Sequence, residues 1–282
     1  MKKLVLILFL ITAFTACIKQ QKKTIQSQSI NKSLRIVSLA QSLSQEIEDL
    51  GLGNNIVGAT SYCHITKKNK DLIIGSSTEI NIEKIILLKP DIVVASTLTQ
   101  PNILESLTKS GINVYCMGKA ASFEEICNEF LNLGKALGKE DKAKEIILKS
   151  KTTIDSIKNK LPKFEKKQKV FFQIGAKPLF SVIPNTYMND YIDLANCTNI
   201  AFDMTSGTIT REAVLKRNPD IIFVVTMGII GSEEINIWRT YKQLSAVKNN
   251  QIFVLKSEIA CTPTPINFAE TFKELIKYVY KF

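Results

Sequence analysis

One segment of this chain occurs twice, and a chain that repeats itself is constrained to fold into two units of similar plan. Residues 82–94 (IEKIILLKPDIVV) are echoed by residues 211–223 (REAVLKRNPDIIF), with a glutamate seven residues before the proline in each copy. Both copies have the pattern of a short helix, a Pro-Asp turn and a buried strand. A looser echo relates residues 49–56 to residues 193–200. Two similar α/β units predict a cleft between them, where small ligands tend to bind.

The N-terminus has the layout of an export signal. Lys2 and Lys3 precede an apolar run of eleven residues, 4–14, and small residues then lead to Cys17. Residues 14–17, Phe-Thr-Ala-Cys, resemble a bacterial lipobox, in which the cysteine is lipidated and becomes the first residue of the mature chain. We therefore predict a lipoprotein signal in residues 1–17. The alternatives are a chance cysteine after an ordinary signal, or a membrane anchor, for which eleven residues are too few.

The rest of the chain divides by composition. Residues 18–33 are polar and charged without an apolar period, which predicts a flexible tether. We place an N-terminal lobe at 34–137, an interlobe backbone helix at 138–165 and a C-terminal lobe at 166–282. The pattern from Glu140 to Leu161 predicts a single helix of about 33 Å, which is long enough to act as a strut and to limit hinge closure.

Strands alternate with helices in both predicted lobes. The apolar runs that we interpret as strands are 35–39, 55–59, 91–95, 113–116, 169–173, 220–225 and 251–255. Helical patterns include 43–50, 102–110 and 266–280, and Ser122 to Glu125 has the form of a capping box. This alternation predicts an α/β fold of two Rossmann-like lobes with mostly parallel sheets, whose ligand groups come from loops at the carboxyl ends of the strands.

The charge distribution argues against a nucleic-acid partner. The net charge is +11, but six lysines and no acidic residue lie in residues 1–32, which leaves 31 basic against 26 acidic residues in the rest. Only four of the basic residues are arginine, whereas base readout favours the forked guanidinium group. Solvated surface lysine explains the excess of positive charge.

Motifs for common chemistries are absent. The five cysteines other than Cys17 are irregularly spaced and odd in number, which indicates neither a disulfide framework nor a zinc site, although one bridge stays open. The chain has no GxxxxGK[ST], HExxH or GxSxG pattern, and it has a single histidine. The carboxylate pairs Glu124–Glu125 and Glu233–Glu234 are adjacent on helices and do not face one another, so a surface enzyme is the weaker interpretation.

Several segments together resemble a known family over nearly all of residues 34–282. They are RIVSLAQS (35–42) with LGLG (50–53) and IVG (56–58), both Glu/Pro-Asp segments, and Trp238 followed by LSAVKNNQIFV (244–254). The chain is similar to the substrate-binding proteins of ABC importers that carry cobalamin, ferric siderophores and haem. The resemblance implies two lobes joined by one backbone helix, no enzymatic activity and no cofactor, with a metal chelate as cargo. It also implies a permease dimer with its cytoplasmic ATPase as partner.

In that family a glutamate on each lobe pairs with arginines of the permease, and the matching positions are Glu83 and Glu212. Local physics offers a second explanation: each glutamate follows a plausible N-cap, Asn81 or Thr210, where the helix dipole favours a carboxylate by about 0.3–1 kcal/mol. The occurrence of the pair on both lobes favours docking.

Loops that follow the predicted strands supply the candidate ligand-binding residues. These are Gln41, Ser42, Tyr62, His64, Thr97 and Gln100 in the first lobe, and Lys177, Phe180, Thr208, Met227, Trp238 and Thr262 in the second. Aromatic and hydroxyl side chains suit a flat, partly apolar ligand. His64 is a candidate metal ligand, but a lone histidine is more often an ordinary loop residue. Trp238 is expected near the cleft, either as a platform for a macrocycle or as a packed anchor.

The cargo is restricted by one departure from the family. Members that capture anionic ferric chelates often carry arginines in the cleft and just before the last helix, where this chain has residues 261–265, Cys-Thr-Pro-Thr-Pro. A neutral or weakly charged chelate, a corrinoid or haem stays open. The sequence thus predicts a monomeric, exported receptor, anchored to the outer face of the cytoplasmic membrane through Cys17. The alternative is a surface lipoprotein that binds a protein or another small ligand without a role in transport.

Overall fold

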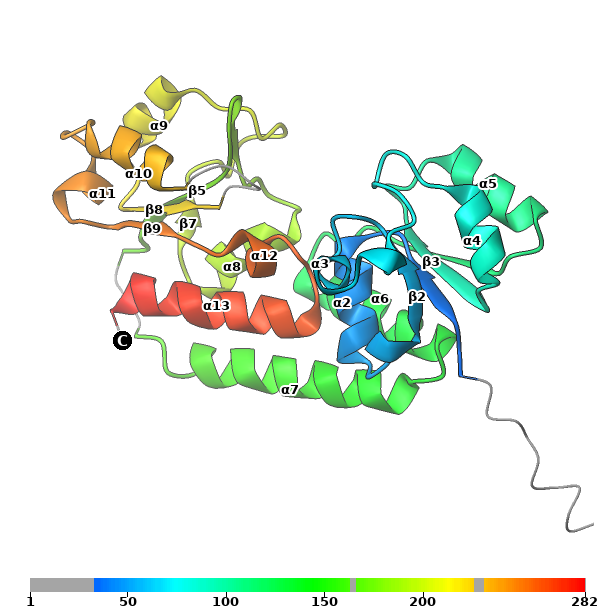
Figure 1. Ribbon diagram of the computed structural model, residues 1–282. Helices are drawn as coiled ribbons and strands as arrows, with labels where there is room; N and C mark the ends of the chain where they lie inside the picture. Colours follow the sequence, from blue (N-terminus) through cyan, green and yellow to red (C-terminus); the bar gives the residue numbers. More distant parts are fainter. Residues whose placement is uncertain (1–32, 163–165, 226–230, 282) are drawn as a thin grey trace, which may run out of the picture. The chain divides into compact units, whose positions relative to one another are not determined.

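The computed structural model describes residues 33–162, 166–225 and 231–281 (Figure 1). Residues 35–282 form one compact unit. The predicted signal, the tether, Cys17 and Met227 lie outside the described residues. Within the described ranges, no helix combines the length and the apolar character that a bilayer span requires.

The N-terminal lobe contains a four-stranded parallel sheet in the order β2-β1-β3-β4. Its strands are β1 (Ile36–Ser38), β2 (Ile56–Ala59), β3 (Ile92–Ser96) and β4 (Val114–Met117). Its helices are α2 (Gln41–Asp49), α3 (His64–Lys68), α4 (Ile82–Leu88) and α5 (Pro101–Lys109), with short 3-10 turns η1 (Gly53–Asn55) and η2 (Lys70–Leu72). Val37, Val93 and Ile85 pack in its core, since strands covered on both faces are apolar along their whole length.

The C-terminal lobe contains a second sheet in the order β6-β5-β8-β9, and β7 also pairs with β5. Its strands are β5 (Lys169–Ala176), β6 (Leu179–Ser181), β7 (Thr198–Asn199), β8 (Ile221–Val224) and β9 (Ile252–Val254). Its helices are α8 (Tyr187–Leu194), α9 (Arg211–Arg217), α10 (Gly231–Arg239), α11 (Ser245–Lys248), α12 (Ser257–Ala260) and α13 (Pro265–Tyr280). Only β6 runs antiparallel to its neighbour, so the predicted α/β fold with mostly parallel sheets is confirmed.

Two helices join the lobes: α6 (Phe123–Ala136) and α7 (Glu140–Lys158). Ser122 caps α6 as predicted, because its Oγ accepts a hydrogen bond from the Glu125 N–H at 3.1 Å. The Glu125 carboxylate accepts from the Ala121 N–H at 2.7 Å, one residue before the position that a capping box uses. The Phe123 ring stacks on Phe268 of α13 at 4.4 Å between centroids, so the first turn of α6 belongs to the C-terminal core. Helix α7 runs beside α6 and α13 and ends three residues earlier than predicted, at 19 residues or about 28 Å (Figure 1).

The repeat found in the sequence is a structural repeat. Asn81 Oδ1 caps α4 by accepting from the Lys84 N–H at 2.8 Å, and Thr210 Oγ1 caps α9 by accepting from the Ala213 N–H at 3.2 Å. Both helices end on a left-handed residue with φ of 46°, Lys89 in α4 and Asn218 in α9. These two helices are therefore equivalent, turn by turn.

The second echo is shifted by one residue from the alignment of letters. The left-handed residues after α2 and α8 are Gly51, at φ 79°, and Asn196, at φ 52°. The letter pattern instead matches Gly51 with Ala195. Asparagine tolerates the left-handed conformation far better than alanine does, which explains why Asn196 and not Ala195 adopts it.

Candidate ligand cleft and docking surface

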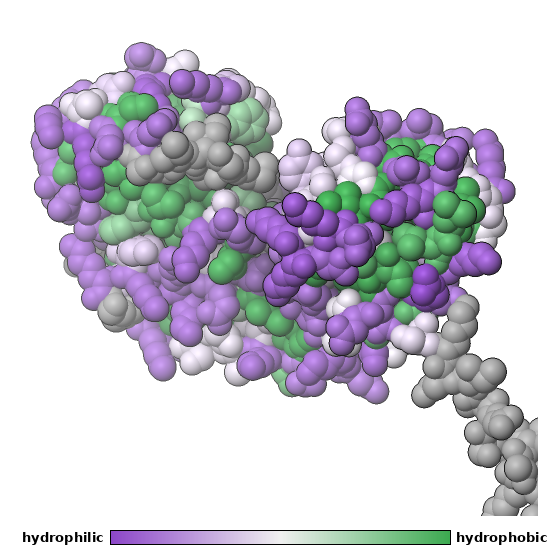
Figure 2. Space-filling model, viewed as in Figure 1, coloured by the Kyte–Doolittle hydropathy of each residue, from purple (hydrophilic) through white to green (hydrophobic). Residues whose placement is uncertain are grey.

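The loops after β1 and β3 bring four predicted ligand residues to one edge of the N-terminal sheet. Gln41 and Ser42 begin α2 and are half-buried, while Thr97 and Gln100 flank the start of α5 and are exposed. Because β1 and β3 are parallel neighbours, their following loops leave the same edge. Figure 2 shows the surface of the unit hollowed between the two lobes.

The loop after β2 provides an aromatic side chain and a histidine that contacts a carboxylate. Tyr62 is 64% exposed, whereas Cys63 is fully buried and lies 3.3 Å from the Thr60 hydroxyl, measured from sulfur to oxygen. His64 starts α3, and its Nε2 pairs with the carboxylate of Glu48. Nowhere in the described residues do three or more histidine, cysteine or acidic side chains meet in a metal-binding group. His64 therefore contacts Glu48 of its own lobe, a partner that the sequence interpretation missed.

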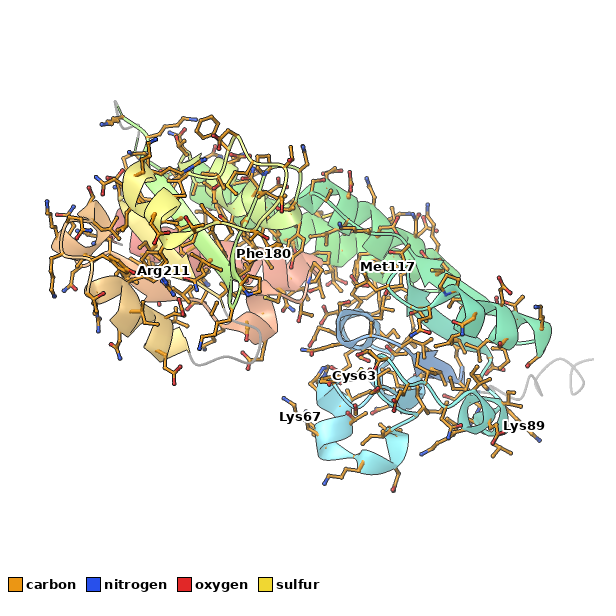
Figure 3. All side chains as sticks on the ribbon, turned by 90° about the horizontal axis from the view of Figure 1, so that it is seen from above. Cys63, Lys67, Lys89, Met117, Phe180 and Arg211 are labelled. Carbon is orange, nitrogen blue, oxygen red and sulfur yellow. The ribbon has the colours of Figure 1, made fainter. Side chains whose placement is uncertain are left out.

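A second exposed aromatic residue comes from the C-terminal lobe. Phe180 in β6 is 37% exposed and forms an antiparallel bridge with Thr208, so two predicted ligand residues lie side by side. A Cβ atom at Gly207 would come within 2.3 Å of the Phe180 ring, so the ring lies against the bare backbone of this glycine. In the view of Figure 3, Phe180 lies between Arg211 and the N-terminal lobe.

Lys177 and Thr262 differ in accessibility. Lys177 is exposed in the turn between β5 and β6. Thr262 is only 6% exposed, and its carbonyl accepts from Asn267 Nδ2 at 3.1 Å. The prediction for Thr262 therefore needs correction: this residue shapes the turn before α13 and offers almost no surface to a ligand.

Trp238 is the largest correction to the predicted site. Its side chain is 0% exposed and packs edge-on against Phe171, with 5.5 Å between ring centroids. Its indole N–H donates to Gln173 Oε1 at 2.7 Å. Trp238 is therefore a packed anchor in the C-terminal core and not a ligand platform, because its ring is enclosed by the apolar core cluster of this lobe and by the Arg211 guanidinium.

A polar network that sequence reasoning missed surrounds this tryptophan. Gln173 Nε2 donates to Glu234 Oε2 at 2.8 Å, and Arg211 Nη2 donates to the same oxygen at 2.8 Å. The Arg211 guanidinium also lies over the Trp238 ring, 4.5 Å from its centroid. Glu234 is only 3% exposed, and its carboxylate neutralises the charge of Arg211, the first residue of α9. The sequence held one signal for this network: the chain has only four arginines in 282 residues, so each arginine is a candidate for a specific ion pair.

The docking candidates occupy equivalent and exposed positions. Glu83 and Glu212 are each the second residue of a seven-residue helix, and both are exposed. Hydrogen bonds from the backbone N–H of Glu212 and from the Thr210 hydroxyl lower the pKa of the Glu212 carboxyl below its usual 4.5. This carboxylate is thus ionised at neutral pH and free to meet a cation.

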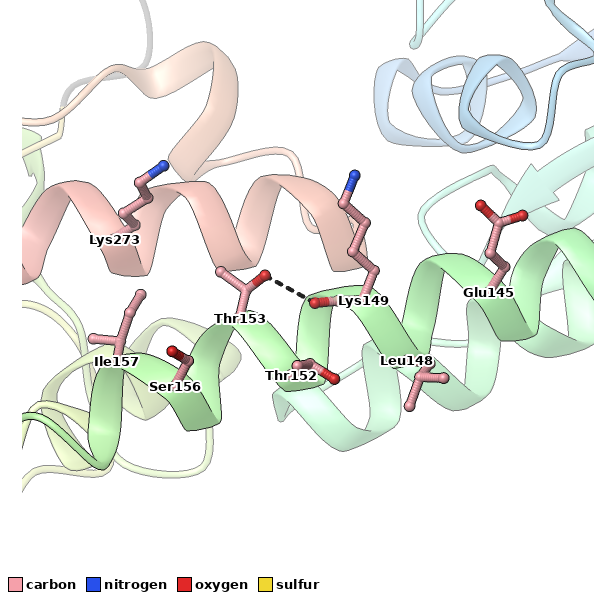
Figure 4. Close-up of a pocket in the computed structure, with 8 residues that line it drawn as sticks. All are labelled: Glu145, Leu148, Lys149, Thr152, Thr153, Ser156, Ile157 and Lys273. Atoms are coloured by element: carbon pink, nitrogen blue, oxygen red, sulfur yellow. Dashed lines mark hydrogen bonds between the residues drawn. The ribbon is translucent and has the colours of Figure 1, made fainter.

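A groove of about 650 Å³ lies elsewhere, along α7 (Figure 4). It is lined by Glu145, Leu148, Lys149, Thr152, Thr153, Ser156 and Ile157 of α7 and by Lys273 of α13. The Thr153 hydroxyl donates to the Lys149 carbonyl of its own helix at 2.8 Å and so does not point at a ligand. None of the predicted site residues lies there.

This chain is similar in sequence to several binding proteins of bacteria. A Bacillus subtilis ABC transporter substrate-binding lipoprotein, YvrC, is 28% identical over 87% of this chain and 80% of its own length. The Fe(3+)-citrate-binding protein YfmC of the same organism is 28% identical over 73% of this chain and 67% of its length. A vitamin B12-binding protein of Vibrio parahaemolyticus is 24% identical over 82% of this chain and 84% of its length.

Solved structures agree with the fold. A periplasmic solute-binding protein from Staphylococcus epidermidis matches with a TM-score of 0.75 and 27% identity, covering 87% of this chain and 98% of its own. The periplasmic haem-binding protein HutB of Vibrio cholerae matches with a TM-score of 0.78 at 18% identity, covering 88% and 100%, and this likeness concerns the fold alone. The family profile described as periplasmic binding protein matches residues 36–259. With its two α/β lobes and no enzymatic function, this chain belongs to the periplasmic binding protein family and is a substrate-binding protein of the ABC importer type.

Proposed function

We propose that this protein is a lipid-anchored receptor that captures a neutral or weakly charged metal chelate outside the cytoplasmic membrane and delivers it to an ABC permease. The chelate is a ferric complex, haem or a corrinoid. Relatives named for ferric citrate and vitamin B12, and a haem-binding structural neighbour, support a metal chelate as cargo, whereas the low charge is inferred from the side chains described below. The lipobox at Cys17 and the lipoprotein name of one relative support the anchor.

One observation carries the transport role: Glu83 and Glu212 stand at the same position of two structurally equivalent helices. A glutamate that only stabilised its own helix would be useful on either lobe alone. Retention of an exposed carboxylate at both positions fits two matching cationic sites on a dimeric permease. The expected partners are therefore a permease dimer and its cytoplasmic ATPase, with one monomeric receptor docked across the dimer.

The candidate ligand residues carry little charge, which supports a cargo of low net charge. Of the candidates that the structure leaves exposed or half-exposed in the two lobes, Lys177 alone carries a permanent charge. Arg211 does not add a second, because Glu234 neutralises it. Tyr62 and Phe180 contribute one exposed aromatic side chain from each lobe, which suits a flat, partly apolar ligand.

The first test is a thermal-shift titration of the purified protein with ferric citrate, haem, cyanocobalamin and a panel of ferric siderophores. A ligand at 100 times its Kd adds about 2.7 kcal/mol to the free energy of unfolding, which is readily measured. A shift with one chelate identifies the cargo. No shift with any chelate, in a folded sample, contradicts the proposal.

The second test concerns docking. Glu83→Gln and Glu212→Gln should abolish or strongly reduce chelate uptake by cells while the purified variants keep the Kd of the parent protein. Glu105→Gln, on an exposed helix face of the N-terminal lobe, is the matched control, since among the described residues this carboxylate pairs only with Lys109, one turn away. Unchanged uptake in the Glu83 and Glu212 variants would refute docking through these residues.

A further inference from the structure

Helix α4 carries apolar side chains that its own lobe does not use. Ile82, Ile85 and Leu88 pack on the N-terminal core at a three-residue spacing, which is sufficient to seat a short helix. Ile86 and Leu87 are outside that core and are 42% and 80% exposed. Figure 2 shows hydrophobic surface on the lobe that carries α4.

These exposed side chains share a face with the docking glutamate. Ile86 and Leu87 follow Glu83 by three and four residues, and residues at these spacings are neighbours on a helix surface. A carboxylate and an 80% exposed leucine therefore form one continuous surface, which we call the α4 docking face: Glu83, Ile86 and Leu87.

The equivalent helix of the C-terminal lobe lacks this apolar surface. Position 86 corresponds to Leu215, which packs against the core of its lobe, and position 87 corresponds to Lys216, which is exposed. The two helices are otherwise equivalent in cap, length and left-handed end. The fold of an α4-type helix thus works without an apolar residue at position 87, so the packing of the lobe does not require Leu87.

We propose that Leu87, with Ile86, makes an apolar contact with the extracytoplasmic surface of the permease, beside the cation that pairs with Glu83. This inference rests on the proposed docking role of Glu83 and extends it: the N-terminal lobe docks through an ionic and an apolar contact, and the C-terminal lobe through Glu212 with Lys216 in place of the leucine. The partner surface has a cationic side chain with an apolar side chain about one helical turn away.

Uptake in cells tests the proposal with the full lipidated chain. The chromosomal gene is replaced by Leu87→Ser, Leu87→Met or Leu148→Ser, and uptake is measured for ferric citrate and haem labelled with radioactive iron and for cyanocobalamin labelled with radioactive cobalt. Leu148 is the matched control, since it is 68% exposed on α7. We expect Leu87→Ser to lower uptake at subsaturating chelate about tenfold, as loss of one buried leucine contact should, and Leu87→Met to retain it.

The outcomes separate this inference from the proposed function. Purified Leu87→Ser must keep the Kd for the chelate and the thermal stability of the parent, so that the loss is assigned to docking. Normal uptake with Leu87→Ser, in cells where Glu83→Gln fails, overturns the apolar contact and leaves the receptor role standing. Equal losses with Leu87→Ser and Leu148→Ser also overturn it. Normal uptake with Glu83→Gln, or no gene-dependent uptake of these three chelates or of any ferric siderophore in the thermal-shift panel, overturns the docking proposal together with this inference.

Discussion

Asp220 Oδ2 accepts a hydrogen bond from the backbone N–H of Lys169 at 2.9 Å, which ties the Pro-Asp turn before β8 to the start of β5. The first lobe repeats this contact: Asp91 Oδ2 accepts from the backbone N–H of Arg35, also at 2.9 Å. In each lobe the basic residue also donates from its side chain to the carbonyl before the left-handed residue, Leu88 in one case and Arg217 in the other. The Asp of the repeated motif therefore joins neighbouring strands and is conserved within the chain for structural reasons.

Asp220→Ala should lower the free energy of unfolding by about 1.5–3 kcal/mol, because it leaves a strand N–H without its charged acceptor. Denaturant titration measures this change. The control is Asp203→Ala, whose carboxylate is 51% exposed and pairs with Arg217, and which should cost less than about 1 kcal/mol. Equal effects of the two substitutions would contradict the structural role of Asp220.

Glu46 should make the protein less stable as the pH rises. Its side chain is 1% exposed, neither carboxylate oxygen has a hydrogen-bond partner among the described residues, and burial, followed by Asp49 and Glu129, raises its pKa well above 4.5. The folded state then binds more protons than the unfolded state, so the contribution of Glu46 to stability is full below about pH 4.5 and is lost as the pH rises through the folded pKa.

Glu46→Leu removes that dependence, and its gain in the free energy of unfolding should be larger at pH 7.5 than at pH 4. Chemical denaturation at the two pH values measures the difference. Two neighbouring groups also have shifted pKa values: burial raises the pKa of Asp49, and burial, followed by Glu129 and Glu46, raises the pKa of Tyr115 to about 12. A gain that is the same at both pH values would show that Glu46 is not the group responsible.

Trp238→Phe should change stability and leave chelate affinity alone. The substitution leaves Gln173 Oε1 without the indole N–H and weakens the cation–π contact of the Arg211 guanidinium, at an expected cost of about 1–3 kcal/mol of unfolding free energy. Its Kd for the chelate should stay within about twofold, since less than about 0.4 kcal/mol is at stake for a residue without exposed surface. Isothermal titration calorimetry measures this Kd, and a large loss of affinity would show that Trp238 contributes to the ligand site.

Tyr62→Ala and Phe180→Ala should each weaken chelate binding about fivefold or more if the aromatic side chains contact the cargo, given about 1 kcal/mol per aromatic contact. Titration of the purified variants measures the effect. Phe202→Ala is the control, because Phe202 is 67% exposed in the same lobe as Phe180 without being a candidate ligand residue. Losses that Phe202→Ala reproduces would not support a site at Tyr62 and Phe180.

Gly207→Ala probes the same site without removing an aromatic ring. The added Cβ would come within 2.3 Å of the Phe180 ring and 2.8 Å of the Ser181 carbonyl oxygen, so the ring must turn away and the backbone at Ser181 must shift. We expect chelate affinity to fall in this variant about as far as in Phe180→Ala, and the double variant to be no weaker than either one. Additive losses would indicate two independent effects.

Local signals in the sequence determined the main strands and helices of this protein and their order, but not the short strands β6 and β7. Apolar runs, the Pro-Asp turns, the capping box at Ser122 and the repeated Glu/Pro-Asp segment act over a few residues, so strands, helices and the equivalence of α4 and α9 follow from them. Only the tertiary structure decided which side chains meet: Gln173 and Glu234 are 61 residues apart in the chain, and no local pattern indicates their contact or the burial of Trp238 beside Gln173. The same holds for Leu87. Its apolar side chain could lie in the core or on the surface, and only the structure shows that Ile85 and Leu88 occupy the core while Leu87 is exposed. Exposure and partnership depend on distant segments competing for the same space, which a one-dimensional pattern does not record.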